Sequence, residues 1–174
     1  IDLAEVFSQA MQFLSLARLR DVLGEEGISQ LRLLNLYDML DTLVWQSAYA
    51  AFEERAFAMA EPSVEKLNAL MEEIDGEFGL NPDNDPTVAL SWIDITHFFE
   101  QPFYVISYPV SGCCALEIYE RELADGTGLQ EYLRLVESEE IGIVGAAREA
   151  GLQNPVTDAR VRDIAAFLDA QFAA

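Results

Sequence analysis

The residues best suited to chemistry lie close together, in the segment 92–112. It contains the only histidine of the 174-residue chain, His97, and two tyrosines, Tyr104 and Tyr108. Large apolar side chains surround all three in the sequence. An imidazole or a phenol hydroxyl needs a hydrogen-bond partner when it is buried, or a ligand when it lines a cleft. The segment therefore indicates a polar site set in an apolar region.

Each of these residues also has an ordinary structural interpretation. Taken alone, His97 is more often a core histidine bonded to a carbonyl group than a functional side chain. Tyr104 and Tyr108 are four residues apart, so in a helix they would share one face and pack against each other as core aromatics. Both interpretations stay open at the level of single residues.

The order of residues in this segment resembles that of a known family. A histidine, an aromatic pair, then Pro-Phe-Tyr with a second tyrosine four residues later is similar to the C-terminal part of the catalytic domain in oligoendopeptidase F and thimet oligopeptidase-like zinc peptidases. The resemblance implies that His97, Tyr104 and Tyr108 donate hydrogen bonds to a peptide substrate and to the oxyanion of the transition state. It leaves open which tyrosine faces the oxyanion.

A second similarity lies at the start of the chain, in residues 2–11. A glutamate followed three residues later by a serine, here Glu5 and Ser8, resembles the family segment that carries the third zinc ligand. The resemblance implies that Glu5 is a metal ligand. Taken alone, Glu5 is more often an acid near a helix N-terminus that interacts with the helix dipole.

In the family, the other two zinc ligands and the catalytic base belong to a His-Glu-x-x-His helix, and this sequence does not contain that motif. A catalytic zinc site needs three protein ligands. The resemblance therefore implies a C-terminal fragment of a zinc endopeptidase whose partner is the missing N-terminal catalytic part. Zinc would belong to the complete enzyme, with none expected bound to this chain, which should be inactive alone. The alternative is a self-standing helical module that binds peptides or a protein without catalysis.

The spacing of apolar residues predicts an all-α fold of about six to nine helices. Apolar residues recur every three or four positions over 33–52, which predicts a long helix ending near Met59. We expect a first helix over 2–22, a break at Gly24 and Gly27, and Ser29 as the N-cap of the long helix. Strand-like alternation is nearly absent. The resemblance implies that the helices adopt the fold of the C-terminal part of a zincin-like oligopeptidase.

The remaining segments fit a single helical domain over residues 1–174. Ser63 is placed to open a third helix, and a further helix is expected over 110–123. Pro109 suits the first turn of that helix but not its interior. The preceding segment, 103–108, is therefore expected to be extended or broken, presenting its tyrosines sideways.

The charge of the chain limits its partners. With 31 acidic and 10 basic residues the net charge is -21, which disfavours nucleic acid and anionic membrane surfaces. Because the acids are spread along every predicted helix, we interpret most of them as a solvated surface. No apolar run approaches the roughly 20 residues of a membrane span. A fragment of a larger enzyme would expose an apolar face, so we expect self-association through that face.

The two cysteines, Cys113 and Cys114, are adjacent in the sequence and have no other partner. Adjacent residues do not readily reach disulfide geometry, so free thiols in a reducing compartment, the cytoplasm, are expected. A nucleophilic cysteine paired with His97 is a minor alternative. Free cysteines are commonly small buried apolar groups, and we favour that interpretation.

Overall fold

The computed structural model describes residues 3–173, which form two compact helical units. Within these residues, unit 1 comprises the chain up to Asp41 and from Val110 onward, and unit 2 comprises Thr42–Pro109. The described part contains eight α-helices, one 3-10 helix and no strand, which confirms the all-α prediction. None of these helices is both long and apolar enough to cross a bilayer.

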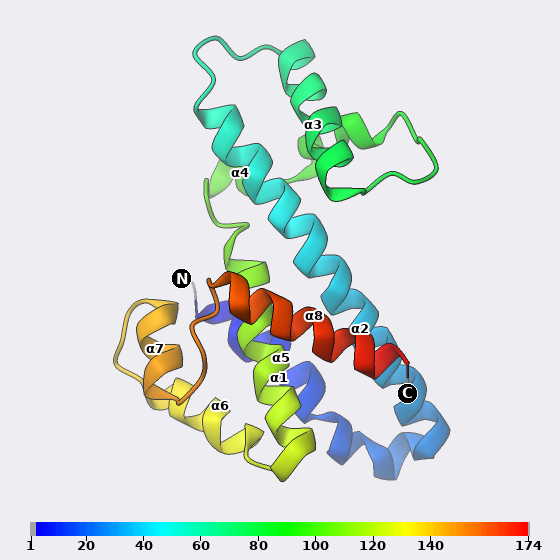
Figure 1. Ribbon diagram of the computed structural model, residues 1–174, viewed down its shortest axis with the longest axis vertical. Coiled ribbons are helices and arrows are strands. Elements are labelled where there is room, and N and C mark those ends of the chain that lie inside the picture. The colour runs from blue at the N-terminus through cyan, green and yellow to red at the C-terminus, as the bar shows by residue number, and fades with distance from the viewer. Residues whose placement is uncertain (1–2, 174) are drawn as a thin grey trace. The chain divides into compact units, whose positions relative to one another are not determined.

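The helices follow one another with short connections, and two of them, α2 and α5, continue from one unit into the other. In chain order they are α1 (Ala4–Leu14), α2 (Leu16–Phe57), α3 (Val64–Phe78), η1 (Val88–Asp94), α4 (His97–Glu100), α5 (Ser107–Asp125), α6 (Gly128–Glu137), α7 (Ile143–Glu149) and α8 (Asp158–Phe172) (Figure 1).

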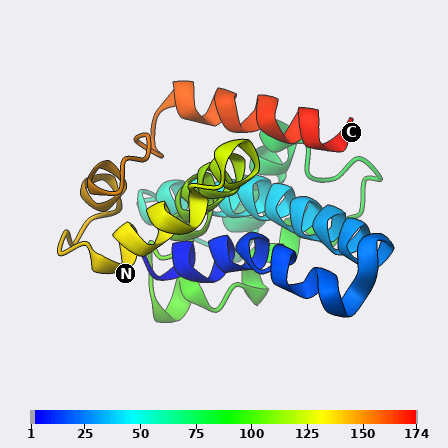
Figure 2. The same cartoon turned by 90° about the horizontal axis from the view of Figure 1, so that it is seen from below.

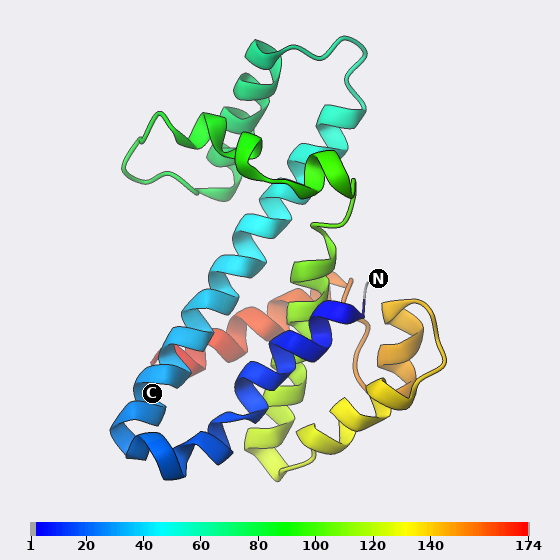
Figure 3. The same cartoon turned by 180° about the vertical axis from the view of Figure 1, so that it is seen from behind.

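Helix α5 is the centre of unit 1, where it lies between α1 and α8 (Figures 2 and 3). Tyr119 of α5 stacks on Phe13 of α1, with ring centroids 4.7 Å apart, and meets Phe167 of α8 edge-on at 6.1 Å. Every residue over 111–119 is buried. Apolar or small side chains suit a helix that is buried on all sides, and the run of small residues in 111–115 provides them for the first part of this stretch.

Unit 2 packs the end of α2 against α3, η1 and α4. Phe52 of α2 lies at its centre, because its ring stacks on both Trp92 and Phe98 at centroid distances of 5.9 and 5.4 Å. Apolar burial of this kind stabilises the unit and fixes the segments that carry Phe98 and Val105. The buried cluster consists of Ala48, Tyr49, Phe52, Leu70, Met71, Ile74, Trp92, Phe98 and Val105.

Two details of the predicted helices are wrong. The helix expected over 2–22 is divided, because α1 ends at Leu14 and α2 begins at Leu16. Of the break expected at Gly24 and Gly27, only the part at Gly24 is confirmed, since its φ of 70° and ψ of 177° interrupt α2. Helical geometry resumes immediately afterwards, so Ser29 lies inside the helix and is not its N-cap. Glycine alone absorbs the change of direction, because it lacks the Cβ that makes such a φ unfavourable.

Other local predictions are confirmed. The Ser63 hydroxyl accepts a hydrogen bond from the Lys66 backbone N–H at 3.3 Å, as an N-cap should. Pro109 lies in the first turn of α5, which begins two residues earlier. The segment before it is broken, as expected: Phe103 has a φ of 65°, and tight turns lead from it into α5.

Candidate functional site

His97, Tyr104 and Tyr108 meet in unit 2, although they come from three different elements. His97 begins α4, Tyr104 lies in the turn that follows, and Tyr108 lies in the first turn of α5. The His97 ring lies 4.9 Å from the Tyr104 ring and 5.9 Å from the Tyr108 ring, and the two tyrosines meet edge-on at 5.5 Å. We call these three residues the histidine–tyrosine cluster.

A hydrogen bond joins the histidine to one of the tyrosines. His97 Nε2 lies 3.1 Å from the Tyr108 hydroxyl oxygen. When the ring nitrogen carries the proton it donates to the phenol oxygen; in the other tautomer the phenol donates to the ring. For Nε2 the partner is thus a hydroxyl rather than the carbonyl expected of a core histidine. All three residues are half-buried.

A fourth polar residue, Glu53 of α2, lies near this cluster. Its side chain is only 2% exposed, and its Oε1 accepts a hydrogen bond from the Phe103 backbone N–H at 2.7 Å. Burial raises the pKa of Glu53, while the bond from Phe103 and the nearby charge of His97 oppose that rise. Sequence reasoning missed this residue. Its spacing of four from the buried Tyr49 is the signal that could have placed it on the inner face of α2.

Glu5 lies in unit 1, in the first turn of α1, where an acid interacts favourably with the helix dipole. Its Oε2 accepts a hydrogen bond from the Ser8 hydroxyl at 3.2 Å. Residues 3–173 contain no group of three or more histidine, cysteine or acidic side chains placed to hold a metal. The role of Glu5 as a metal ligand stays a prediction.

The cysteines lie on α5, and both are free and buried. Burial raises the pKa of the Cys113 thiol and raises that of Cys114 to about 12. The thiolate is the nucleophilic form of cysteine. These environments oppose its formation, which disfavours the nucleophilic alternative.

We expect the native thiols to react very slowly with a disulfide reagent. At about pH 8, a thiol with the pKa of Cys114 holds roughly 10³-fold less thiolate than one with an ordinary pKa, and burial slows access further. The measurement is the rate of mixed-disulfide formation in native protein, compared with the same protein unfolded in guanidinium chloride. One thiol that reacts equally fast in both states would contradict this expectation.

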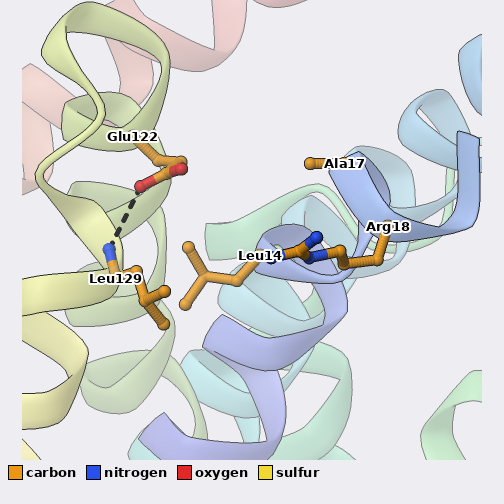
Figure 4. A pocket seen from close by; sticks show the side chains of 5 residues that line it. All are labelled: Leu14, Ala17, Arg18, Glu122 and Leu129. Atoms are coloured by element: carbon orange, nitrogen blue, oxygen red, sulfur yellow. Dashed lines mark hydrogen bonds between the residues drawn. The ribbon is translucent and has the colours of Figure 1, made fainter.

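A separate hollow of about 210 Å³ lies in unit 1. Figure 4 shows Glu122 pointing to the start of α6, where its Oε2 accepts a hydrogen bond from the Leu129 backbone N–H at 3.1 Å. That carboxylate therefore caps a helix, and the lining provides no nucleophile or second acid. The hollow is lined by Leu14, Ala17, Arg18, Glu122 and Leu129.

Comparison with known proteins adds no relative. No family model matches the chain, and neither a curated protein nor a solved structure is similar enough to count as a match. The resemblance to zinc oligopeptidases consequently depends on segments 2–11 and 92–112 of the sequence.

Proposed function

We propose that this chain is the C-terminal part of the catalytic domain of a zinc-dependent oligopeptidase, in which the histidine–tyrosine cluster binds the peptide substrate. The observation that supports this proposal best is the 3.1 Å contact between His97 Nε2 and the Tyr108 hydroxyl. Hydrolysis of a peptide bond places negative charge on the carbonyl oxygen in the transition state. Imidazole and phenol groups, held in position before the reaction, can stabilise that charge by hydrogen bonding.

In this proposal each side chain has a distinct role. Tyr108, oriented by His97, donates its hydroxyl hydrogen to the carbonyl oxygen of the scissile bond. Tyr104 packs its ring against His97 and uses its hydroxyl to hold the substrate backbone. Glu5 is the only metal ligand that this chain would provide, so a segment carrying the His-Glu-x-x-His helix must complete the site.

Reconstitution tests the proposal directly. We expect the isolated chain to cleave no peptide and to bind zinc no more tightly than an unrelated acidic surface, because a lone carboxylate is a weak ligand. Co-expression with a segment that carries the His-Glu-x-x-His helix should give chelator-sensitive endopeptidase activity on a mixed peptide library. Cleavage by the isolated chain, or a folded complex that is inactive at every zinc concentration, would contradict the proposal.

A substitution at Glu5 separates metal binding from substrate binding. In the reconstituted complex we expect Glu5→Gln to weaken the metal site, so added zinc should restore part of the activity. A variant that lacks a transition-state donor should show no such recovery. Glu26→Gln, at an exposed position of α2, is the matched control and should behave as wild type. An activity loss in Glu5→Gln that zinc leaves unchanged would argue against a ligand role.

One observation favours the alternative of a peptide-binding module. Phe57 and Phe103 are 57% and 55% exposed, and their ring centroids lie 5.0 Å apart. Exposed aromatic pairs can bind apolar side chains of a peptide. Peptide binding by the chain alone, lost in Phe57→Ser and combined with failed reconstitution, would favour this module over the peptidase.

A further inference from the structure

Glu53 and Phe57 of α2 both contact Phe103, which lies in the turn before α5. Glu53 and Phe57 are one helical turn apart, so they lie on the same face of α2. Glu53 Oε1 accepts the hydrogen bond from the Phe103 N–H at 2.7 Å, and the Phe57 ring packs against the Phe103 ring. One contact thus holds the backbone of Phe103 and the other holds its side chain.

The conformation of Phe103 makes these contacts significant. Its φ of 65° lies in the left-handed region, which is unfavourable for a bulky residue other than glycine. Such a conformation persists when the surrounding structure over-determines it, and it concentrates at functional sites. Here an aromatic residue stands where a glycine would be relaxed. The contact with Phe57 fixes the position of the Phe103 ring, and the hydrogen bond to Glu53 stabilises the backbone conformation.

The burial of Glu53 is itself costly. A carboxylate taken out of water is unfavourable unless it is hydrogen-bonded, and both Phe52 beside it and Tyr49 one turn earlier belong to the apolar core. An apolar residue at this position would pack without that penalty. A glutamate here therefore points to a role for the acceptor oxygen rather than to packing.

Phe103 lies between the two halves of the histidine–tyrosine cluster. Buried Phe98 fixes the α4 side, next to His97, and buried Val105 fixes the other side, next to Tyr104. The direction of the chain at Phe103 then sets how the two tyrosine rings meet the imidazole. We propose that Glu53 is the positioning residue of this cluster: by holding the Phe103 amide, it fixes the turn that brings Tyr104 and Tyr108 against His97.

The geometric part of this inference is independent of the proposed function and can be tested on the chain alone. In Glu53→Ala we expect the Phe103 amide to exchange with solvent about 10- to 100-fold faster, because its acceptor is gone. Nuclear Overhauser contacts between the rings of His97 and Tyr108 should weaken, and a single histidine makes them easy to assign. The amide of Ile74, in the core of unit 2, should keep its protection and reports global stability.

Two matched variants complete the test. Glu53→Gln retains an acceptor oxygen of the same reach, so it should preserve both the Phe103 protection and the ring contacts. Glu54→Ala removes the exposed neighbouring acid and should behave as wild type. Wild-type Phe103 exchange and ring contacts in Glu53→Ala would overturn the proposal.

Should Glu53→Ala fail to fold, the same substitution is made together with Phe103→Gly. Glycine adopts a left-handed φ without help, so the double variant should recover both the fold and the contact between His97 and Tyr108. A double variant that folds without that contact, or does not fold, would overturn the proposal.

The catalytic consequence rests on the proposed function. In the reconstituted enzyme, Glu53→Ala should lower kcat about 10-fold or more with KM nearly unchanged, because misplaced donors affect the transition state more than binding. Glu53→Gln should restore kcat. If the wild-type complex is inactive, the peptidase proposal fails, while the exchange of the Phe103 amide still decides the role of Glu53.

Discussion

Tyr108→Phe is expected to lower kcat of the reconstituted peptidase by about 10²- to 10³-fold, the usual loss when one oxyanion donor is removed. The hydroxyl lies 3.1 Å from His97 Nε2, so its direction is set by the imidazole before substrate arrives. Removing it deletes the donor and leaves the ring in place. The measurement is steady-state cleavage of an internally quenched peptide, with kcat and KM determined separately.

The free energy of unfolding of Tyr108→Phe and the turnover of Tyr104→Phe serve as controls. Loss of one hydroxyl should change the free energy of unfolding by only about 1 kcal/mol, so the variant should remain folded. Tyr104→Phe keeps the ring packed 4.9 Å from His97 and should lose much less turnover. A larger loss in Tyr104→Phe would assign the oxyanion to Tyr104 instead, and wild-type turnover in both variants would favour the binding module.

The helices were predictable because their signals are local. Apolar spacing over 33–52 reports which face of α2 is buried, and the hydroxyl of Ser63 satisfies an N–H three residues away. The error at Ser29 has the same origin. A serine after a glycine predicts a helix start, but in the folded chain Gly24 alone makes the break, and the surrounding residues keep their helical bonds.

One part of the candidate site could be predicted from local sequence, and another part could not. His97, Tyr104 and Tyr108 lie within one short segment, so their proximity was visible in the sequence. The bond from Phe103 to Glu53 joins residues 50 positions apart, and a left-handed φ at a phenylalanine has no sequence signature. The interpretation of the acids as a solvated surface is wrong for Glu53, which is buried. Burial of an individual acid depends on tertiary packing, which the sequence does not show.

Glu117 of α5 is a buried acid, 2% exposed, that pairs with two arginines. It accepts hydrogen bonds from the Arg121 guanidinium at 2.5 Å and from the Gln153 backbone N–H at 3.1 Å. Arg160 of α8, 1% exposed, places its Nε 3.3 Å from Glu117 Oε2, but the two groups are poorly aligned for a hydrogen bond. Arg160 is therefore stabilised mainly by the charge of Glu117, with the partly exposed Glu120 further away at 3.5 Å.

Glu117→Gln should consequently lower the free energy of unfolding by about 3–5 kcal/mol, the typical cost of leaving a buried charge without its partner. Glutamine keeps the size and one acceptor, so the loss reports charge rather than a cavity. The measurement is urea denaturation at neutral pH. Glu139→Gln, an exposed acid in the loop after α6, is the matched control and should stay within about 0.5 kcal/mol of wild type.

Removing the charges of both Glu117 and Arg160 separates the contribution of this ion pair from that of the neighbouring charges. When Arg160→Met is added to Glu117→Gln, no cation remains buried on α8, so the double variant should be more stable than Glu117→Gln alone. Arg121 still has Glu131 as a partner at 2.6 Å, which limits the remaining loss. A Glu117→Gln variant within about 1 kcal/mol of wild type would mean that solvent or Glu120 already neutralises Arg160, and that Glu117 is not the centre of this network.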